Sequence, residues 1–95
     1  MHGLYPVLRV SLEVSKGGIR VVTPSDSISG IVISTDTALM YIYRELAGIP
    51  TCNRRFWILQ KALDALRHES DCSKLEQCIN NPMVVDVLRR KHMAE

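Results

Sequence analysis

The stretch VLRVSLEVSKGGIRVV, residues 7–22, alternates apolar and polar side chains on both sides of a glycine pair. In a β-strand successive side chains point to opposite faces, so the first half places four apolar residues on one face: Leu8, Val10, Leu12 and Val14. Gly17 and Gly18 provide the backbone freedom that a tight turn requires, and Ile19 and Val21 then resume the alternation. The stretch therefore predicts a β-hairpin with one buried face.

The residues after the hairpin predict one more strand and then helices. A turn-forming cluster at residues 23–27 precedes residues 28–34, whose apolar run predicts a central strand covered on both faces. From Thr35 onward the apolar residues recur at helical spacing, as in the series Leu39, Ile42, Tyr43 and Leu46. We expect Thr35 or Asp36 to cap this helix, and Gly48 with Pro50 to end it.

Three further helices are expected in the second half of the chain. One runs from Thr51 or Asn53 to His68, and a short one follows the break at residues 70–71 with three inward-facing residues: Leu75, Cys78 and Ile79. The last begins at Pro82, after the cap Asn81, with Met83, Val84, Val87 and Leu88 on its apolar face. Strands followed by helices predict a single α+β domain, residues 1–95, in which a small antiparallel sheet of about three strands packs against three to four helices.

Composition excludes several classes of protein. The chain is 46% hydrophobic and 23% charged, which is typical of a globular domain rather than a disordered one. No apolar run approaches the ~20 residues of a membrane span, and the first residues do not resemble a secretory signal. Three cysteines, an odd number, favour a reducing compartment, so we expect an intracellular protein of the cytoplasm or nucleus.

The helix expected to end at His68 carries the clearest candidate for a binding surface. At 100° per residue, Arg54, Trp57, Lys61 and His68 form one stripe opposite the leucines of the same helix. A large aromatic side chain on a basic, solvent-facing stripe is typical of residues that anchor protein interfaces. The alternative is that Trp57 packs over the sheet edge or a neighbouring helix.

The positive charge predicts a second kind of partner. The net charge of +2 arises in the second half of the chain, which ends in the basic cluster Arg89, Arg90 and Lys91. Together with Arg54 and Lys61, these residues could contact the phosphates of a nucleic acid while Trp57 stacks on a base. Cations in a last helical turn also interact favourably with the helix dipole, so the cluster has a structural explanation as well.

Cysteine and histidine residues allow a third hypothesis, a small zinc protein or cysteine enzyme. Cys52, His68, Cys72 and Cys78 could complete a tetrahedral zinc site, but the chain has no pair of cysteines at the spacing of a zinc knuckle. Neither Cys52 nor Cys72 lies in a nucleophile motif, and the chain has no phosphate-binding or dinucleotide-binding loop. We therefore expect no cofactor, no metal and no enzymatic activity.

These observations favour a non-enzymatic module that regulates or binds another protein. We expect Arg54, Trp57 and Lys61 to contact that partner and an open edge of the sheet to provide a second contact surface. Pairing of such edges would produce a homodimer. A nucleic-acid-binding regulator is the first alternative, and a zinc protein or enzyme the second.

Overall fold

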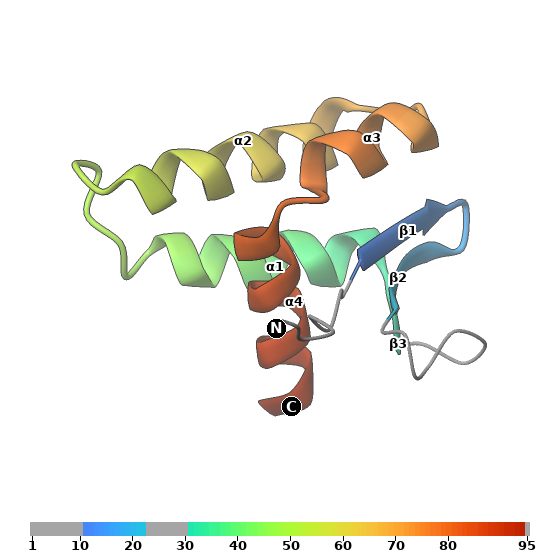
Figure 1. Ribbon diagram of the computed structural model, residues 1–95, viewed down its shortest axis with the longest axis horizontal. Coiled ribbons are helices and arrows are strands. Elements are labelled where there is room, and N and C mark those ends of the chain that lie inside the picture. Colours follow the sequence, from blue (N-terminus) through green and yellow to red (C-terminus); the bar gives the residue numbers. More distant parts are fainter. Residues whose placement is uncertain (1–10, 23–30, 95) are drawn as a thin grey trace, which may run out of the picture.

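The computed structural model describes residues 11–22 and 31–94 as a small sheet followed by four helices (Figure 1). Three strands and four helices follow one another along the chain: β1 (Ser11–Ser15), β2 (Gly18–Val22), β3 (Ile31–Ile33), α1 (Thr35–Leu46), α2 (Arg54–His68), α3 (Cys72–Ile79) and α4 (Pro82–Ala94). The α+β class predicted from the sequence is thus confirmed. Residues 7–10 and 28–30, which were expected to extend the first and third strands, lie outside the described residues, as does the expected turn at residues 23–27.

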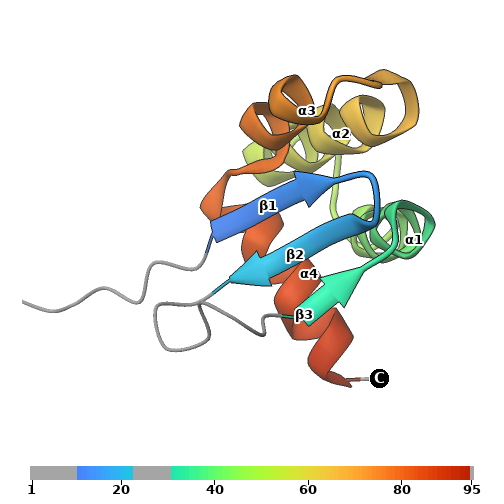
Figure 2. The same ribbon diagram turned by 90° about the vertical axis from the view of Figure 1, so that its right-hand side faces the viewer.

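The sheet is antiparallel with the order β1-β2-β3, and Figure 2 shows it with the helices behind and beside it. The expectation that the third strand is central was wrong, because β2 pairs with both neighbours and β3 pairs with β2 alone among the described strands. Val32 of β3 is 59% exposed, so this strand is not covered on both faces. Because β3 consists of three apolar residues in a row, its sequence lacks the alternation of apolar and polar residues that marks a half-buried strand.

The hairpin turn depends on Gly18. This residue has a φ of +133°, a backbone conformation that side chains with a Cβ rarely adopt. A Cβ at Gly18 would also lie 2.6 Å from the carbonyl oxygen of Ile33, because β3 passes directly beside this position. Gly17 has more room, since the nearest atom to a Cβ there would be Ser15 Oγ at 3.8 Å. Gly18 is therefore the position at which the turn packs closely against β3.

One face of the sheet and the inner faces of all four helices form a single core. The strands contribute Leu12, Ile19, Val21 and Ile33, and opposite them lie the buried residues of the helices: Ala38, Tyr41, Ile42, Leu46, Leu59, Ala62, Leu63, Leu66, Leu75, Ile79, Val84, Val85, Val87 and Leu88. On the outer face of the sheet, Arg20 forms an ion pair with its cross-strand neighbour Glu13 at 2.8 Å. The predicted face of the hairpin is thus the one that packs against the helices.

Three side chains predicted to face the core do not. Tyr43 is 68% exposed, Met83 is exposed, and Cys78 of α3 is also exposed, although its neighbours Leu75 and Ile79 are buried. Each of the three lies at the border of an apolar stripe, where helical spacing alone does not decide whether another element covers the side chain. The exposed position of Tyr43 matters for the candidate site described below.

Side-chain caps fix the starts of the helices. Ser34, and not Thr35 or Asp36 as expected, caps α1 by accepting a hydrogen bond from the Thr37 amide at 3.1 Å. Asn53 caps α2 in the same way, and Asn81 Oδ1 accepts from the Met83 amide at 2.9 Å at the start of α4, as predicted. The caps therefore fix the residues at which α1 and α2 begin.

The outer edge of β1 is closed by side chains of the α3 region. Asn80 accepts a hydrogen bond from the Leu12 amide and donates one to the Leu12 carbonyl, both at 3.2 Å. Glu76 accepts from the Val14 amide at 2.8 Å. The two side chains therefore satisfy three of the backbone groups that a fourth strand would otherwise bind: the N–H and C=O of Leu12 and the N–H of Val14.

Candidate protein-binding surface

The predicted stripe lies on the solvent-facing side of α2. Arg54, Trp57, Lys61 and His68 are all exposed, and Trp57 keeps 58% of its surface accessible. Neither the sheet nor a helix in the described part of the chain covers the indole, in contrast to the alternative considered from the sequence. We refer to Arg54, Trp57 and Lys61 as the Trp57 surface.

The indole of Trp57 is held in place although it is exposed. Its N–H donates a hydrogen bond to the Thr51 carbonyl at 2.8 Å, so the ring leans back over the turn between α1 and α2. The ring of Phe56 meets it edge to face, with 5.1 Å between the ring centres. Because these contacts fix the side chain in advance, a partner that binds Trp57 would lose less conformational entropy than it would on an unrestrained side chain.

A groove with a mostly apolar lining runs between α1 and α2, next to Phe56. Its first part, about 230 Å³, is lined by Tyr43, Leu46, Ala47, Phe56, Gln60 and Leu63. Its second part, about 320 Å³, is lined by Leu39, Met40, Tyr43, Leu63 and Arg67. Tyr43 and Leu63 line both parts, so the two lie next to each other along α1 and α2. We call this feature the α1/α2 groove.

Lys61 lies on the other side of α2, at a hollow between α2 and α3. This hollow is lined mostly by polar side chains: Ile58, Lys61, Gln77, Cys78, Asn80 and Asn81. Asn80 and Asn81 are already engaged, the first with β1 and the second with the start of α4. The apolar part of the α2 surface therefore lies on its α1 side, whereas Lys61 lies beside a mostly polar hollow.

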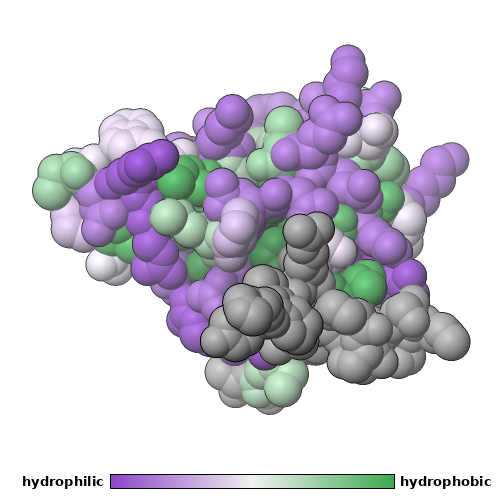
Figure 3. Space-filling view, viewed as in Figure 1, coloured by the Kyte–Doolittle hydropathy of each residue, from purple (hydrophilic) through white to green (hydrophobic). Residues whose placement is uncertain are grey.

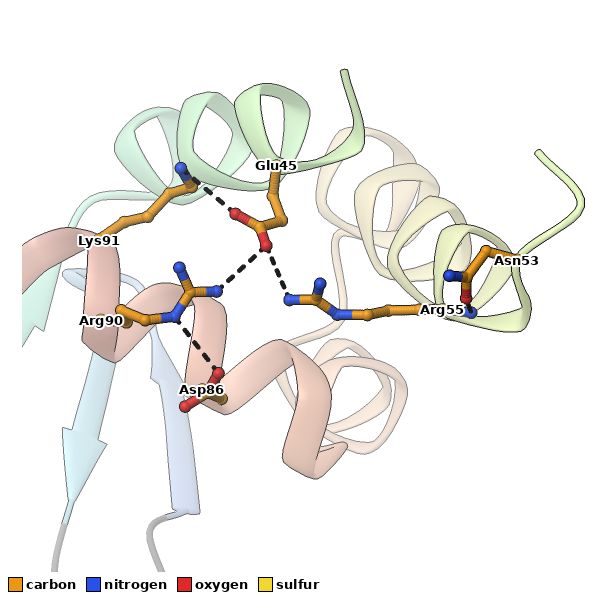
Figure 4. Close-up of polar contacts among 6 residues, drawn as sticks. All are labelled: Glu45, Asn53, Arg55, Asp86, Arg90 and Lys91. Atoms are coloured by element: carbon orange, nitrogen blue, oxygen red, sulfur yellow. Dashed lines mark hydrogen bonds and ion pairs between the residues drawn. The ribbon is translucent and has the colours of Figure 1, made fainter. Parts of the chain in front are cut away.

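Glu45 is the centre of a group of ion pairs that joins three helices (Figure 4). Its Oε2 accepts hydrogen bonds from Arg55 of α2 at 2.7 Å and Arg90 of α4 at 3.1 Å. Its Oε1 lies 3.3 Å from Lys91 Nζ, and Arg90 also contacts Asp86 at 3.5 Å. The Glu45 side chain is 14% exposed, so these pairs are partly shielded from water.

The charge of Glu45 is favoured by these neighbours. Partial burial raises the pKa of Glu45, but hydrogen bonds from Arg90, Lys91 and Arg55 together outweigh it, so the pKa lies below its ordinary value of 4.5. The same contact with Glu45 raises the pKa of Arg90. The group therefore acts as a structural link between α1, α2 and α4 at neutral pH.

The residues predicted to contact nucleic acid do not form one free basic surface. Arg90 and Lys91 are bound to Glu45, whereas Arg54, Lys61 and Arg89 are exposed. Figure 3 shows hydrophilic side chains over much of the described surface on the side where α4 lies in front of α1, with small hydrophobic patches between them. Two of the five predicted cations thus have a structural role within the described chain.

The cysteines and histidines of the zinc hypothesis are dispersed. All three cysteines are free thiols, and Cys52 lies in the turn before α2 whereas Cys72 and Cys78 belong to α3. Within residues 11–22 and 31–94, no three side chains of the types His, Cys, Asp or Glu are grouped so that they could hold a metal ion. In the same residues, no helix combines the length and the hydrophobicity needed to cross a membrane.

The sequence predicted that Arg54, Trp57 and Lys61 share an exposed side of α2, but it did not predict the α1/α2 groove. Tyr43 and Leu39 were assigned to a buried stripe, because their spacing matches that of Ile42 and Leu46. Helical spacing places Tyr43 beside Ile42 and Leu46 and does not show whether another helix covers it. Comparison of the chain with protein-family models, curated proteins and solved structures finds no match.

Proposed function

We propose that this protein is a non-enzymatic interaction module that acts inside the cell by binding another protein through the Trp57 surface. The observation that carries the proposal is the exposed yet fixed indole of Trp57. Tryptophan is enriched among the few residues that account for most of the binding energy of protein interfaces, and arginine is enriched with it. Arg54 and Lys61 supply charged groups at the border of that aromatic centre.

We further propose that the chain forms a homodimer through the outer edge of β3. Among the described strands, β3 is bound on one side only, whereas side chains of the α3 region occupy the edge of β1. The register directs the N–H and C=O of Val32 toward the open edge. An edge this short supplies few hydrogen bonds, so we expect a dimer that dissociates on dilution.

The first test measures mass and bound nucleic acid together. Size-exclusion chromatography with light scattering is run on the full chain at low and high salt, with absorbance recorded at 260 and 280 nm. A concentration-dependent dimer without excess absorbance at 260 nm supports the proposal. Nucleic acid that high salt removes would contradict it and favour the basic residues Arg54, Lys61 and Arg89. A strict monomer at all concentrations would exclude the dimer.

The second test concerns Trp57 itself. Proteins retained by the immobilised wild-type chain are compared with those retained by Trp57→Ala and by the control Lys74→Ala, which alters an exposed side chain of α3. Circular dichroism establishes that both variants are folded. For a purified partner, we expect Trp57→Ala to weaken binding at least thirtyfold and Lys74→Ala less than threefold. Equal loss with both variants, or none with either, would refute the proposed surface.

A further inference from the structure

The α1/α2 groove has the length and lining of a site for a short helix. We propose that it binds an acidic amphipathic helix of the partner protein, an inference that rests on the proposed function and specifies the partner. Phe56 and Arg67 mark its two ends along α2. At a rise of 1.5 Å per residue they are about 16 Å apart, which corresponds to roughly three helical turns.

The exposed apolar residues of the groove have the character of a helix-binding surface. Tyr43 is 68% exposed and Met40 is 40% exposed, and both lie beside the buried Leu63. Methionine and aromatic side chains adapt to the apolar face of an incoming helix, which contacts such a groove at every third or fourth residue. On an α-helix, Tyr43 lies about 200° around the axis from Glu45, which faces α4, so α4 leaves the groove open.

The charged side chain that lines the groove indicates which charge the partner helix carries. Among the cations of α2, Arg67 lines the groove, whereas Arg54 and Lys61 belong to the stripe on the other side of the helix. Arg55 is bound to Glu45 and Asp64 accepts a hydrogen bond from Gln60, whereas Arg67 lines the groove and is exposed. A helix with acidic residues beside its apolar face would place them against Arg67.

The same charges argue against a second copy of this chain in the groove. In a two-fold symmetric interface each molecule presents the same patch, so each copy would bring its own Arg67 into the contact, and the lining of the described groove has no acidic side chain to pair with it. Like charges brought together at an interface disfavour association. Homodimer formation through the β3 edge involves a different part of the molecule and is compatible with a partner helix in the groove.

Two synthetic peptides provide the test. Both are helical 16-residue sequences with the same leucine and phenylalanine positions, at spacings of three and four residues, and they differ only in having glutamate or lysine at the flanking positions. Isothermal titration calorimetry gives the affinities, and amide chemical shifts of the full-length protein locate the bound peptide. The variants are Tyr43→Ala, Arg67→Glu and, as a matched charge reversal outside the groove, Arg89→Glu.

We expect the glutamate peptide to bind at least tenfold more tightly than the lysine peptide, with shift changes around Tyr43 and Leu63. Tyr43→Ala should weaken both peptides at least tenfold. Arg67→Glu should weaken the glutamate peptide at least tenfold and strengthen the lysine peptide, and Arg89→Glu should alter either affinity less than threefold. Equal affinities, shifts confined to another surface, or no binding of the glutamate peptide at 1 mM would overturn the inference.

The two proposals can fail separately. If neither peptide binds while Trp57→Ala still abolishes partner binding, the acidic-helix inference is wrong and the interaction module stands. If the glutamate peptide binds the groove but Trp57→Ala leaves partner binding intact, the Trp57 surface is wrong and the groove stands. If no variant weakens the binding of either the peptide or the partner protein, both proposals are refuted.

Discussion

Replacement of Gly18 by alanine should destabilise the domain, whereas the same replacement at Gly17 should not. The new Cβ would lie 2.6 Å from the carbonyl oxygen of Ile33 and 3.3 Å from its carbonyl carbon. Both atoms belong to backbone, so β3 must move to relieve the contact. The φ of +133° would be strained for alanine in addition.

The expected loss in the free energy of unfolding follows from these two effects. Holding a side chain in a φ region reserved for glycine costs about 1–3 kcal/mol, and overpacking adds about 1–3 kcal/mol, part of which is relieved when β3 shifts. We expect Gly18→Ala to lower the free energy of unfolding by about 2–4 kcal/mol. A domain of this size has a total stability of about 5–14 kcal/mol, so the variant should remain folded but close to its limit.

The assay is urea denaturation followed by circular dichroism, with Gly17→Ala as the matched control. A Cβ at Gly17 would lie 3.8 Å from Ser15 Oγ, and Gly17 does not have a positive φ, so this variant should be as stable as the wild type or up to about 1 kcal/mol more stable. For an m-value of about 2 kcal/mol/M, Gly18→Ala should lower the urea midpoint by about 1–2 M. Equal midpoints for the two variants would refute the close approach of β3 to Gly18.

Three further predictions concern polar contacts and metal. Asn80→Asp removes the donor to the Leu12 carbonyl, so it should lower the free energy of unfolding by about 1–3 kcal/mol and speed amide exchange at Leu12. The control Asn81→Asp keeps its acceptor role at the start of α4 and should change the free energy of unfolding by no more than about 0.5 kcal/mol. Equal losses in the two variants would contradict the edge contacts of Asn80. Glu45→Gln should lower the free energy of unfolding by about 1–2 kcal/mol at pH 7. Because the pKa of Glu45 in the folded protein is below 4.5, this difference between variant and wild type should be full above pH 4.5 and disappear as the pH falls through that pKa. A difference that persists at pH 2 would show that the charge of Glu45 is not the cause. A chelator should leave the melting temperature unchanged, and the purified chain should contain far less than one equivalent of zinc. A melting temperature that falls on chelation would support the zinc hypothesis instead.

The parts of the fold that local chemistry determines could be predicted from the sequence. The alternation around Gly17 and Gly18 located the hairpin and its buried face, Asn81 located the start of α4, and Asn53 was one of the two starts expected for α2. These signals depend on neighbours within a few residues, which the sequence shows directly.

Features that depend on distant contacts were missed. The closing of the β1 edge joins Leu12 to Asn80, residues 68 positions apart, and the position of β3 at the sheet edge follows from which strand lies beside it. The exposure of Tyr43 likewise depends on how far α2 lies from α1, and no local pattern encodes that distance. The shared exposure of Arg54, Trp57 and Lys61 could be predicted because one helix alone places them on one side.

The contacts of Asn80 and Glu76 with β1 have a consequence for how large an assembly of this chain can become. Strand addition extends without limit only when each molecule offers an edge at both ends of its sheet, as in fibrils. Here side chains of the α3 region occupy the edge of β1, and among the described strands only β3 has an edge left to pair. Two copies joined at β3 would each present a blocked end to solvent, so growth by this route stops at the pair, and a high concentration of the protein should yield dimers rather than filaments.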